Sequence, residues 1–263
     1  MEKPKFQWIK IDKKRAYVII TLNRPKKLNA IDDSMRNELI KAFEWVSKED
    51  SVRAVILTGN GKAFCAGGDI AAMRDRLEVP LEKVAMNGWA RQRRTHQAVT
   101  MLHSLSKPTI AAVNGVAAGL GADLALCCDF IISSNQSIFT MSYLLRGLIP
   151  DGGGMYFLPR RVGLACAKKL IFSGRRVDAA EALSIGMVDA VVKHKNLIDE
   201  SLSIADKMTV GSPHALALAK SILDKSLELS IEEVFELGCQ AQAICYTTDY
   251  HRDAVKSFLE KSK

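Results

Sequence analysis

The feature that most constrains the fold is an alternation of short β-branched apolar runs with amphipathic segments of helical period. Residues 16–22 (AYVIITL) and 53–57 (RAVIL) are typical of buried strands, and residues 34–46 between them carry apolar side chains at helical spacing. A strand, helix, strand order favours a sheet whose strands are joined by crossover helices. The sequence therefore predicts an α/β fold.

The alternation continues along the chain before it gives way to helices. We predict, in order, a loop at 64–70, a helix at 81–105, a strand at 109–115, a glycine-rich turn at 116–121, a helix at 122–129, and strands at 130–134 and 187–192. From residue 197 onward the period is helical, with an amphipathic stretch over 231–261. This division gives a core, 1–196, and a helical region, 197–263, which could cover its own core or pack against a neighbouring subunit.

Composition and charge narrow the range of partners. Hydrophobic residues make up 48% of the chain and charged residues 25%, as in ordinary globular proteins. No apolar run reaches the roughly 18 to 20 residues that span a bilayer. The net charge of +8 favours an anionic partner, either nucleic acid or a phosphorylated small molecule. Nucleic acid is the weaker expectation because aromatics are only 6% and no basic stripe with interleaved aromatics is evident.

Neither a metal site nor a disulfide framework is expected. The six cysteines form no CxxC pair, and the five histidines have no spacing typical of metal ligands. The amino end, MEKPKFQWIK, carries charges and a proline where a signal peptide would be apolar, which predicts a cytoplasmic protein.

Two glycine-rich turns are candidates for binding through the backbone. The segment GLGADL (119–124) lacks the third glycine of a dinucleotide fingerprint, and no glycine run leads into the Lys-Ser or Lys-Thr of a P-loop. However, Gly67-Gly68 and residues 119–121 each follow a strand, where a turn into a helix leaves N–H groups without acceptors. Two such turns could converge on one carbonyl oxygen and form an oxyanion hole.

A third glycine-rich segment, GLIPDGGG (147–154), contains one acid, Asp151. Pro-Asp-Gly is good turn chemistry by itself, because proline presets φ and aspartate can cap its own backbone. The alternative is that the turn presents a catalytic carboxylate.

The motifs together resemble the crotonase superfamily, the enoyl-CoA hydratases and isomerases. The likeness covers nearly the whole chain and lies in LNRPKKLNAI (22–31), CAGGDI (65–70), KPTIAAVNGVAAGLGADLALCCD (107–129), GLIPDGGG (147–154) and DAVKSFLEK (253–261). It implies a ClpP-like spiral of ββα repeats with a helical carboxyl-terminal region, assembled as a homotrimer or a dimer of trimers. It also implies that acyl-CoA thioesters bind and that Gly68 and Leu120 supply the two oxyanion amides.

The resemblance assigns further residues to the substrate and no separate cofactor, since coenzyme A is part of the thioester. Phe258 and Lys261 would lie near the coenzyme A site of a neighbouring subunit. The segments expected to wrap the coenzyme A nucleotide and pantetheine contain Lys26, Lys27, Leu28, Ala66, Asp69 and Ile70.

The chain also departs from the hydratase pattern. Hydratases of this superfamily hold water between two glutamates, whose positions here are Asp123 and Tyr143. Tyrosine, with a pKa near 10, is no carboxylate base at neutral pH and is interpreted as a pocket wall. The resemblance instead assigns Asp151 as the catalytic carboxylate, with Asp123 either assisting or structural, as in the 2-(1,2-epoxy-1,2-dihydrophenyl)acetyl-CoA isomerase branch.

We therefore expect an enoyl-CoA isomerase that moves a double bond. A hydratase of fatty-acid or aromatic-acid degradation, using Asp123 and Asp151 around a water, is the alternative within the enzyme class. Outside that class, the alternative is a non-catalytic protein that binds acyl-CoA or RNA. A salt-sensitive nucleic-acid shift would separate RNA binding from coenzyme A binding.

Overall fold

The computed structural model describes residues 4–261 and divides into two compact units, one ending at Ala205 and one beginning at Asp206. The sequence-based division falls before helix α8 (Leu197–Met208), most of which belongs to the first unit. No helix within residues 4–261 is both long enough and apolar enough to cross a membrane.

The first unit is built on a six-stranded sheet. Its order is β1 (Ile9–Lys14), β2 (Tyr17–Leu22), β3 (Ala54–Gly59), β5 (Thr109–Val113), β7 (Phe130–Ser134) and β10 (Ala190–Val192). Strands β1 and β2 are antiparallel, and the remaining pairs are parallel. The central strands are apolar along almost their whole length because helices cover both faces of a parallel sheet. The α/β prediction is confirmed.

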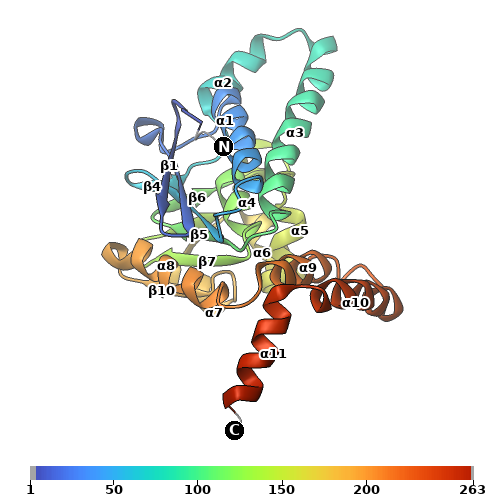
Figure 1. Ribbon diagram of the computed structural model, residues 1–263. Coiled ribbons are helices and arrows are strands. Elements are labelled where there is room, and N and C mark those ends of the chain that lie inside the picture. The colour runs from blue at the N-terminus through green and yellow to red at the C-terminus, as the bar shows by residue number, and fades with distance from the viewer. Residues whose placement is uncertain (1–3, 262–263) are drawn as a thin grey trace. The chain divides into compact units, whose positions relative to one another are not determined.

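Alternate residues of each strand enter two different cores. Ile19, Ile56 and Ile110 pack with residues of α8, including Leu197. Their neighbours along the strands pack on the other face against α1 (Asp33–Ser47) and α3 (Leu81–His103), which run alongside each other in Figure 1. Successive side chains of a strand point to opposite faces, so a single β-branched run supplies both cores.

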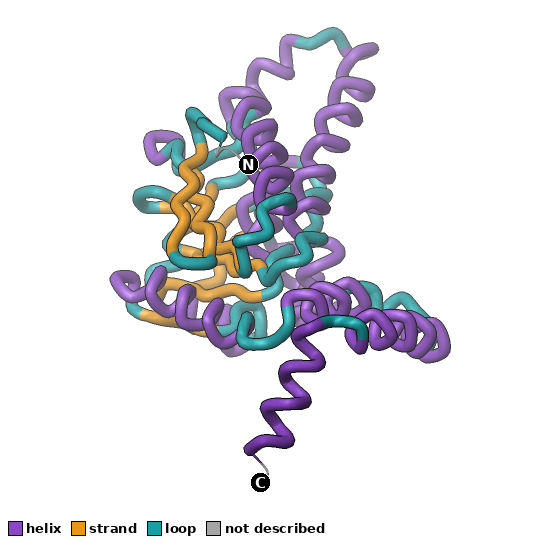
Figure 2. The backbone as a smooth tube through the Cα atoms, in the orientation of Figure 1, coloured by secondary structure: helices purple, strands orange, loops and turns teal. Residues whose placement is uncertain are grey.

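A second sheet explains the repeated units. Its strands are only three residues long and run in the order β4 (Ala63–Cys65), β6 (Val116–Ala118), β8 (Ile138–Thr140) and β9 (Arg176–Asp178). The strands of both sheets are orange in Figure 2. Strand pairs β3–β4, β5–β6 and β7–β8 each give their first strand to the large sheet and their second to this one. The loop predicted at 64–70 and the turn predicted at 116–121 were therefore partly wrong, because they contain the end of β4 and all of β6.

Helices fill the connections between these strands. They are η1 (Pro25–Lys27), α2 (Ile70–Asp75), η2 (Arg76–Glu78), α4 (Leu120–Leu126), η3 (Leu144–Arg146), α5 (Gly154–Val162), α6 (Leu164–Ser173), α7 (Ala179–Ser184) and η4 (His194–Asn196). The second unit contains α9 (Pro213–Leu223), α10 (Ile231–Tyr246) and α11 (Asp249–Lys261). Ser230 and Glu233 form a capping box at the start of α10, which stabilises its first turn.

Candidate active site

The turns that follow β4 and β6 are in contact, and two glycines make this possible. A Cβ at Gly121 would lie 2.1 Å from the carbonyl oxygen of Cys65. A Cβ at Gly67, whose φ is +94°, would lie 2.7 Å from the carbonyl oxygen of Ala118 and 3.5 Å from the nitrogen of Leu120. Only glycine fits at these two points, and the two turns therefore meet as the sequence hypothesis required.

The amides of Gly68 and Leu120 are left available by the local backbone. The N–H of Ile31 donates to Gly67 (2.7 Å) and the carbonyl of Ile31 accepts from Asp69 (3.0 Å), so the Gly68 peptide group between them faces away from this parallel bridge. Leu120 is the first residue of α4, and its N–H has no acceptor inside the helix. Neither amide has an acceptor among residues 4–261.

Gly68 and Leu120 both line one cavity of about 450 Å³. Tyr143 and Asp151 line the same cavity, so the structure brings together four of the predicted site residues. Its wall also contains four arginines that the sequence did not single out, namely Arg36, Arg76, Arg91 and Arg146. No motif marks these arginines, because they come from separate elements that meet only after folding.

Asp151 lies in the tight turn between η3 and α5. Its N–H donates to the carbonyl of Ile149 (2.8 Å), and its side chain is 24% exposed. The Nε2 atom of His96 on α3 lies 3.6 Å from Asp151 Oδ2, and both residues line a second cavity of about 310 Å³. Asp151 thus forms a wall shared by the two cavities. His96 was not predicted, since it lies in no recognisable motif.

Asp123 is held behind this surface rather than in it. The carboxyl group has no exposure to solvent, and its Oδ2 atom accepts a hydrogen bond from the Tyr143 hydroxyl. Burial raises the pKa of Asp123 to about 7; the Tyr143 bond opposes this shift and the Asp151 carboxylate adds to it. Burial, followed by the charge of Asp123, likewise raises the pKa of Tyr143. Within the described residues Asp123 lines neither cavity.

The glycine run after Asp151 has a packing explanation. A Cβ at Gly152 would lie 2.5 Å from Asp123 Oδ2, and a Cβ at Gly154 would lie 2.6 Å from Oδ1. Gly153 adopts φ +113°, which side chains of L residues rarely allow. The three glycines therefore let the Asp151 turn close directly over Asp123.

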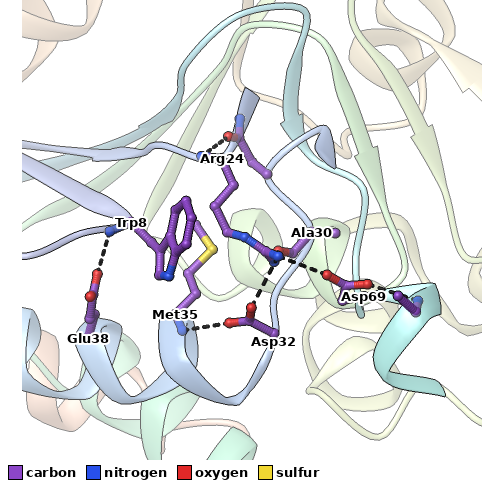
Figure 3. A network of polar contacts seen from close by, with 9 residues as sticks. Trp8, Arg24, Ala30, Asp32, Met35, Glu38 and Asp69 are labelled. Carbon is purple, nitrogen blue, oxygen red and sulfur yellow. Dashed lines mark hydrogen bonds and ion pairs between the residues drawn. The ribbon is translucent and has the colours of Figure 1, made fainter. Parts of the chain in front are cut away.

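Arg24 fixes the loop that carries Gly68. Figure 3 shows its guanidinium between Asp32 and Asp69, with the Trp8 ring alongside. Arg24 Nη2 lies 2.9 Å from Asp69 Oδ2 and 3.1 Å from Asp32 Oδ2, and these two aspartates cap the first turns of α2 and α1. Burial alone would raise the pKa of Asp69, but Arg24 and the amide of Ala71 together lower it. The Asp69 carboxylate is therefore engaged within the protein.

The other residues predicted to bind coenzyme A form two groups. Lys26, Lys27 and Leu28 are exposed on and after η1, and the carbonyl of Leu28 accepts from the amide of Ala66 (2.9 Å), which joins this segment to the Gly68 loop. Ile70 is 60% exposed at the start of α2. The predicted roles of Phe258 and Lys261, which lie on α11 in the second unit, stay predictions.

A thiol closes the inner side of the Gly67 turn. Cys65 Sγ donates to the carbonyl of Asn29 (3.1 Å) and accepts from the N–H of Gly67 (3.4 Å). Burial raises the pKa of Cys65 to about 12. The thiol is therefore a neutral packing group, because the thiolate is the reactive form.

Comparison with known proteins agrees with this architecture. Residues 12–263 match the family model described as enoyl-CoA hydratase/isomerase. The chain is 35% identical over 254 residues to a short-chain-enoyl-CoA hydratase of Clostridium acetobutylicum, covering 96% of this chain and 95% of that one. It is 34% identical over 247 residues to the 1,2-epoxyphenylacetyl-CoA isomerase of Escherichia coli, covering 94% and 93%.

Solved structures give the same result for the fold. An enoyl-CoA hydratase from Bacillus anthracis superposes with a TM-score of 0.89 at 32% identity, covering 97% of each chain. An enoyl-CoA hydratase/isomerase from Cupriavidus metallidurans superposes with a TM-score of 0.90 at 33% identity, covering 98% of this chain and 96% of the other. The expected fold, a crotonase-type α/β arrangement with a helical carboxyl-terminal region, is confirmed.

Proposed function

This chain belongs to the enoyl-CoA hydratase/isomerase family, and we propose that within the family it moves the double bond of an enoyl-CoA thioester by proton transfer. One observation carries the proposal: among the described residues that line the cavity of Gly68 and Leu120, Asp151 is the only one with a carboxylate. A double-bond shift needs one base that can take and return a proton.

The two backbone amides would bind the thioester oxygen. When a proton leaves the carbon next to the carbonyl, negative charge moves to that oxygen. N–H groups fixed in advance at Gly68 and Leu120 stabilise this charge without reorganising. The glycine contacts and the Ile31 bridge support this assignment because they hold both amides in place before substrate arrives.

Asp151 would remove that proton and return a proton to the carbon at the far end of the conjugated system. The electron pair of the broken C–H bond becomes the new double bond between carbons 2 and 3, and the electron pair of the original double bond forms the new C–H bond at the distant carbon. The same carboxylic acid returns a proton, which can exchange with solvent first because the Asp151 side chain is 24% exposed, so no further reactant is needed. The turn that carries Asp151 is short and is followed by three glycines. This suits a base that must come within hydrogen-bond distance of two different carbons.

Asp123 would act through Tyr143 and not on the substrate. A hydratase-like water site needs two groups that face one water. Here Asp123 occupies the first position and is buried, and Tyr143 occupies the second and already donates its hydroxyl to Asp123. This arrangement favours isomerisation over hydration. The alternative is hydration with Asp151 as the sole base. It must be tested because some relatives of this chain are named as hydratases.

The test is a panel of 2-enoyl-CoA and 3-enoyl-CoA thioesters incubated in heavy water and followed by mass spectrometry. Isomerisation predicts interconversion of the two series with exchange of carbon-bound hydrogen and no gain of a water. Asp151→Asn is the control and should abolish exchange and interconversion together. A product that has gained one water as the main outcome would contradict the proposal and favour the hydratase.

Other properties follow as part of the same proposal. The steps above use no metal or redox cofactor, and coenzyme A takes part only as the thioester of the substrate. Assembly as a homotrimer or a dimer of trimers, a place in fatty-acid metabolism and a cytoplasmic location stay predictions.

A further inference from the structure

The cavity that contains Gly68 and Leu120 has a strongly cationic wall. Arg36 on α1, Arg76 on η2 and Arg91 on α3 all line it, although these residues are far apart in the sequence. Met73 and Leu77 line the cavity beside them. A cavity that took only an aliphatic acyl chain would gain nothing from three guanidinium groups on its wall, one of which, Arg36, is buried and has lost hydration.

Arg36 is buried with part of its hydrogen-bonding capacity unused. The residue is 5% exposed, and its Nη1 atom pairs with the carboxylate of Asp33, which is itself 73% exposed. The Nε atom of Arg36 is buried and has no hydrogen-bond partner. Leaving a buried donor unsatisfied is costly, and an acceptor brought to this guanidinium from the cavity that Arg36 lines would lower that cost.

The arginines also affect one another. Burial lowers the pKa of Arg76, and the positive charges of Arg91 and Arg36 lower it further, against the weaker opposing effects of Asp33 and Asp69. Within residues 4–261, neither Arg76 nor Arg91 forms a salt bridge. Three guanidiniums are thus gathered on one wall, and among the described residues the one salt bridge that any of them forms is that of Arg36 with Asp33. The excess positive charge calls for an anion.

We propose that this anion is a carboxylate at the end of the acyl group, so that the substrate is an enoyl-CoA derived from a dicarboxylic acid. The proposal rests on the function proposed above. The cavity is the one that receives the thioester carbonyl at Gly68 and Leu120, and Lys26 to Leu28, expected to hold the nucleotide, do not line it. The planar fork of arginine matches a carboxylate with two parallel hydrogen bonds.

The experiment compares two five-carbon enoyl-CoA thioesters, one ending in a carboxylate and one ending in a methyl group, together with coenzyme A alone. Binding is measured by calorimetry and turnover by kcat/KM. The wild type should prefer the carboxylate-ended thioester by roughly 10- to 100-fold, as expected for charge-assisted hydrogen bonds. Arg91→Met should remove most of this preference. Arg93→Met, on the same helix but stacked on Trp89 outside the cavity, is the matched control and should keep it.

Two results would overturn the inference. If Arg91→Met weakens coenzyme A and both thioesters by the same factor, the arginines bind a phosphate of coenzyme A and not the acyl group. If the wild type shows no preference for the carboxylate, there is no acyl anion site. Arg36→Met serves as a second variant, with its fold checked by circular dichroism. Failure of the isomerase proposal remains distinguishable, because an arginine-dependent preference in calorimetry would persist without any double-bond shift.

Discussion

Asp151 and Asp123 show how two neighbouring carboxyl groups acquire different chemistry from their surroundings. Asp151 is partly exposed on a wall shared by two cavities, whereas Asp123 is enclosed by Tyr143 and the glycines that follow Asp151. A base must reach its proton within hydrogen-bond distance. Exposure to the cavity therefore separates the catalytic candidate from the supporting one.

Replacing Asp151 by asparagine should lower kcat by roughly 10² to 10⁴-fold, because this removes the proposed general base while keeping its size and much of its turn chemistry. Affinity for the thioester should change little, since binding belongs to other segments. Steady-state kinetics with the preferred thioester and calorimetry on the same samples measure the two quantities. Asp123→Asn should cost less, and Tyr143→Phe least. An active Asp151→Asn beside an inactive Asp123→Asn would reverse the assigned roles.

Asp123 should also make stability depend on pH. Its folded pKa of about 7 lies above the value near 3.9 of an unfolded chain. Between those values the folded state binds more protons, so the free energy of unfolding should fall as pH rises from about 4 to 7 and then level off. Asp123→Asn removes this term and should be the more stable protein at pH 8, by up to about 4 kcal/mol, since each pKa unit corresponds to about 1.4 kcal/mol.

Urea unfolding of the wild type and Asp123→Asn at pH 5 and pH 8 tests the point. The difference in the free energy of unfolding between the two proteins should be small at pH 5 and large at pH 8. A difference of the same size at both values would mean that Asp123 is ionised throughout and that the surrounding groups hold its charge.

The sequence could predict some of these residues and not others. Asp151, Gly68 and Leu120 stand in local motifs, where the backbone chemistry is set by nearby glycines. The burial of Asp123 depends on contacts with residues 143 and 152–154, and His96 reaches Asp151 only because α3 packs beside the turn. Side-chain partners that are distant in sequence leave no local signature.

At the scale of elements, the closest contact in the site is the one between the turns after β4 and β6. Gly121→Ala would place a methyl group 2.1 Å from the carbonyl oxygen of Cys65, and backbone cannot move aside cheaply. We expect the free energy of unfolding to fall by at least about 2 kcal/mol. Activity should fall further than the smaller folded fraction accounts for, because the amide of Leu120 would shift.

Gly88→Ala is the matched control for this substitution. Gly88 lies within α3, and the nearest atom to an added Cβ is 3.8 Å away. Alanine should therefore be neutral or stabilise by up to about 1 kcal/mol, as usual for glycine in a helix. Chemical denaturation and initial rates on both variants measure the contrast. If Gly121→Ala and Gly88→Ala had the same stability and the same activity, the two turns could separate without loss of either property.

The elements differ in how far they could be predicted. Strands β2, β3, β5 and β7 and helix α3 were predicted because five or more residues give a clear period, whereas β1 of the same sheet was not predicted. Strands β4 and β6 are three residues long and adjoin glycine turns, so they were interpreted as loop or turn. For the same reason no internal repeat was visible: the second strand of each unit is too short to carry a pattern, and the repeat exists in the topology alone.

At the scale of the whole molecule, the second unit has few buried side chains of its own. Within α9, α10 and α11 no residue of the described range is buried, and the apolar Ile222, Val234, Phe235 and Tyr246 line a hollow of about 740 Å³ on this unit. Exposed apolar surface of this kind marks interaction sites. It supports the predicted assembly into trimers or hexamers.

Light scattering at micromolar concentration should therefore give three or six times the chain mass. Phe235→Asp should shift the mass toward the monomer, because a charge in an apolar interface is strongly unfavourable. Lys41→Asp, at an exposed position of α1 in the first unit, is a charge-changing control outside the hollow. A wild-type monomer under these conditions would refute the assembly.

The buried thiol of Cys65 makes the site readable by chemical labelling. Its sulfur lies under the Gly67 turn and stays protonated, while Cys166 on α6 is partly exposed. A haloacetamide should therefore modify Cys166 faster than Cys65, which reacts only when the turn opens. The rate of labelling at Cys65, followed by peptide mass spectrometry, would report how often the Gly67 turn opens. A bound thioester should slow this labelling.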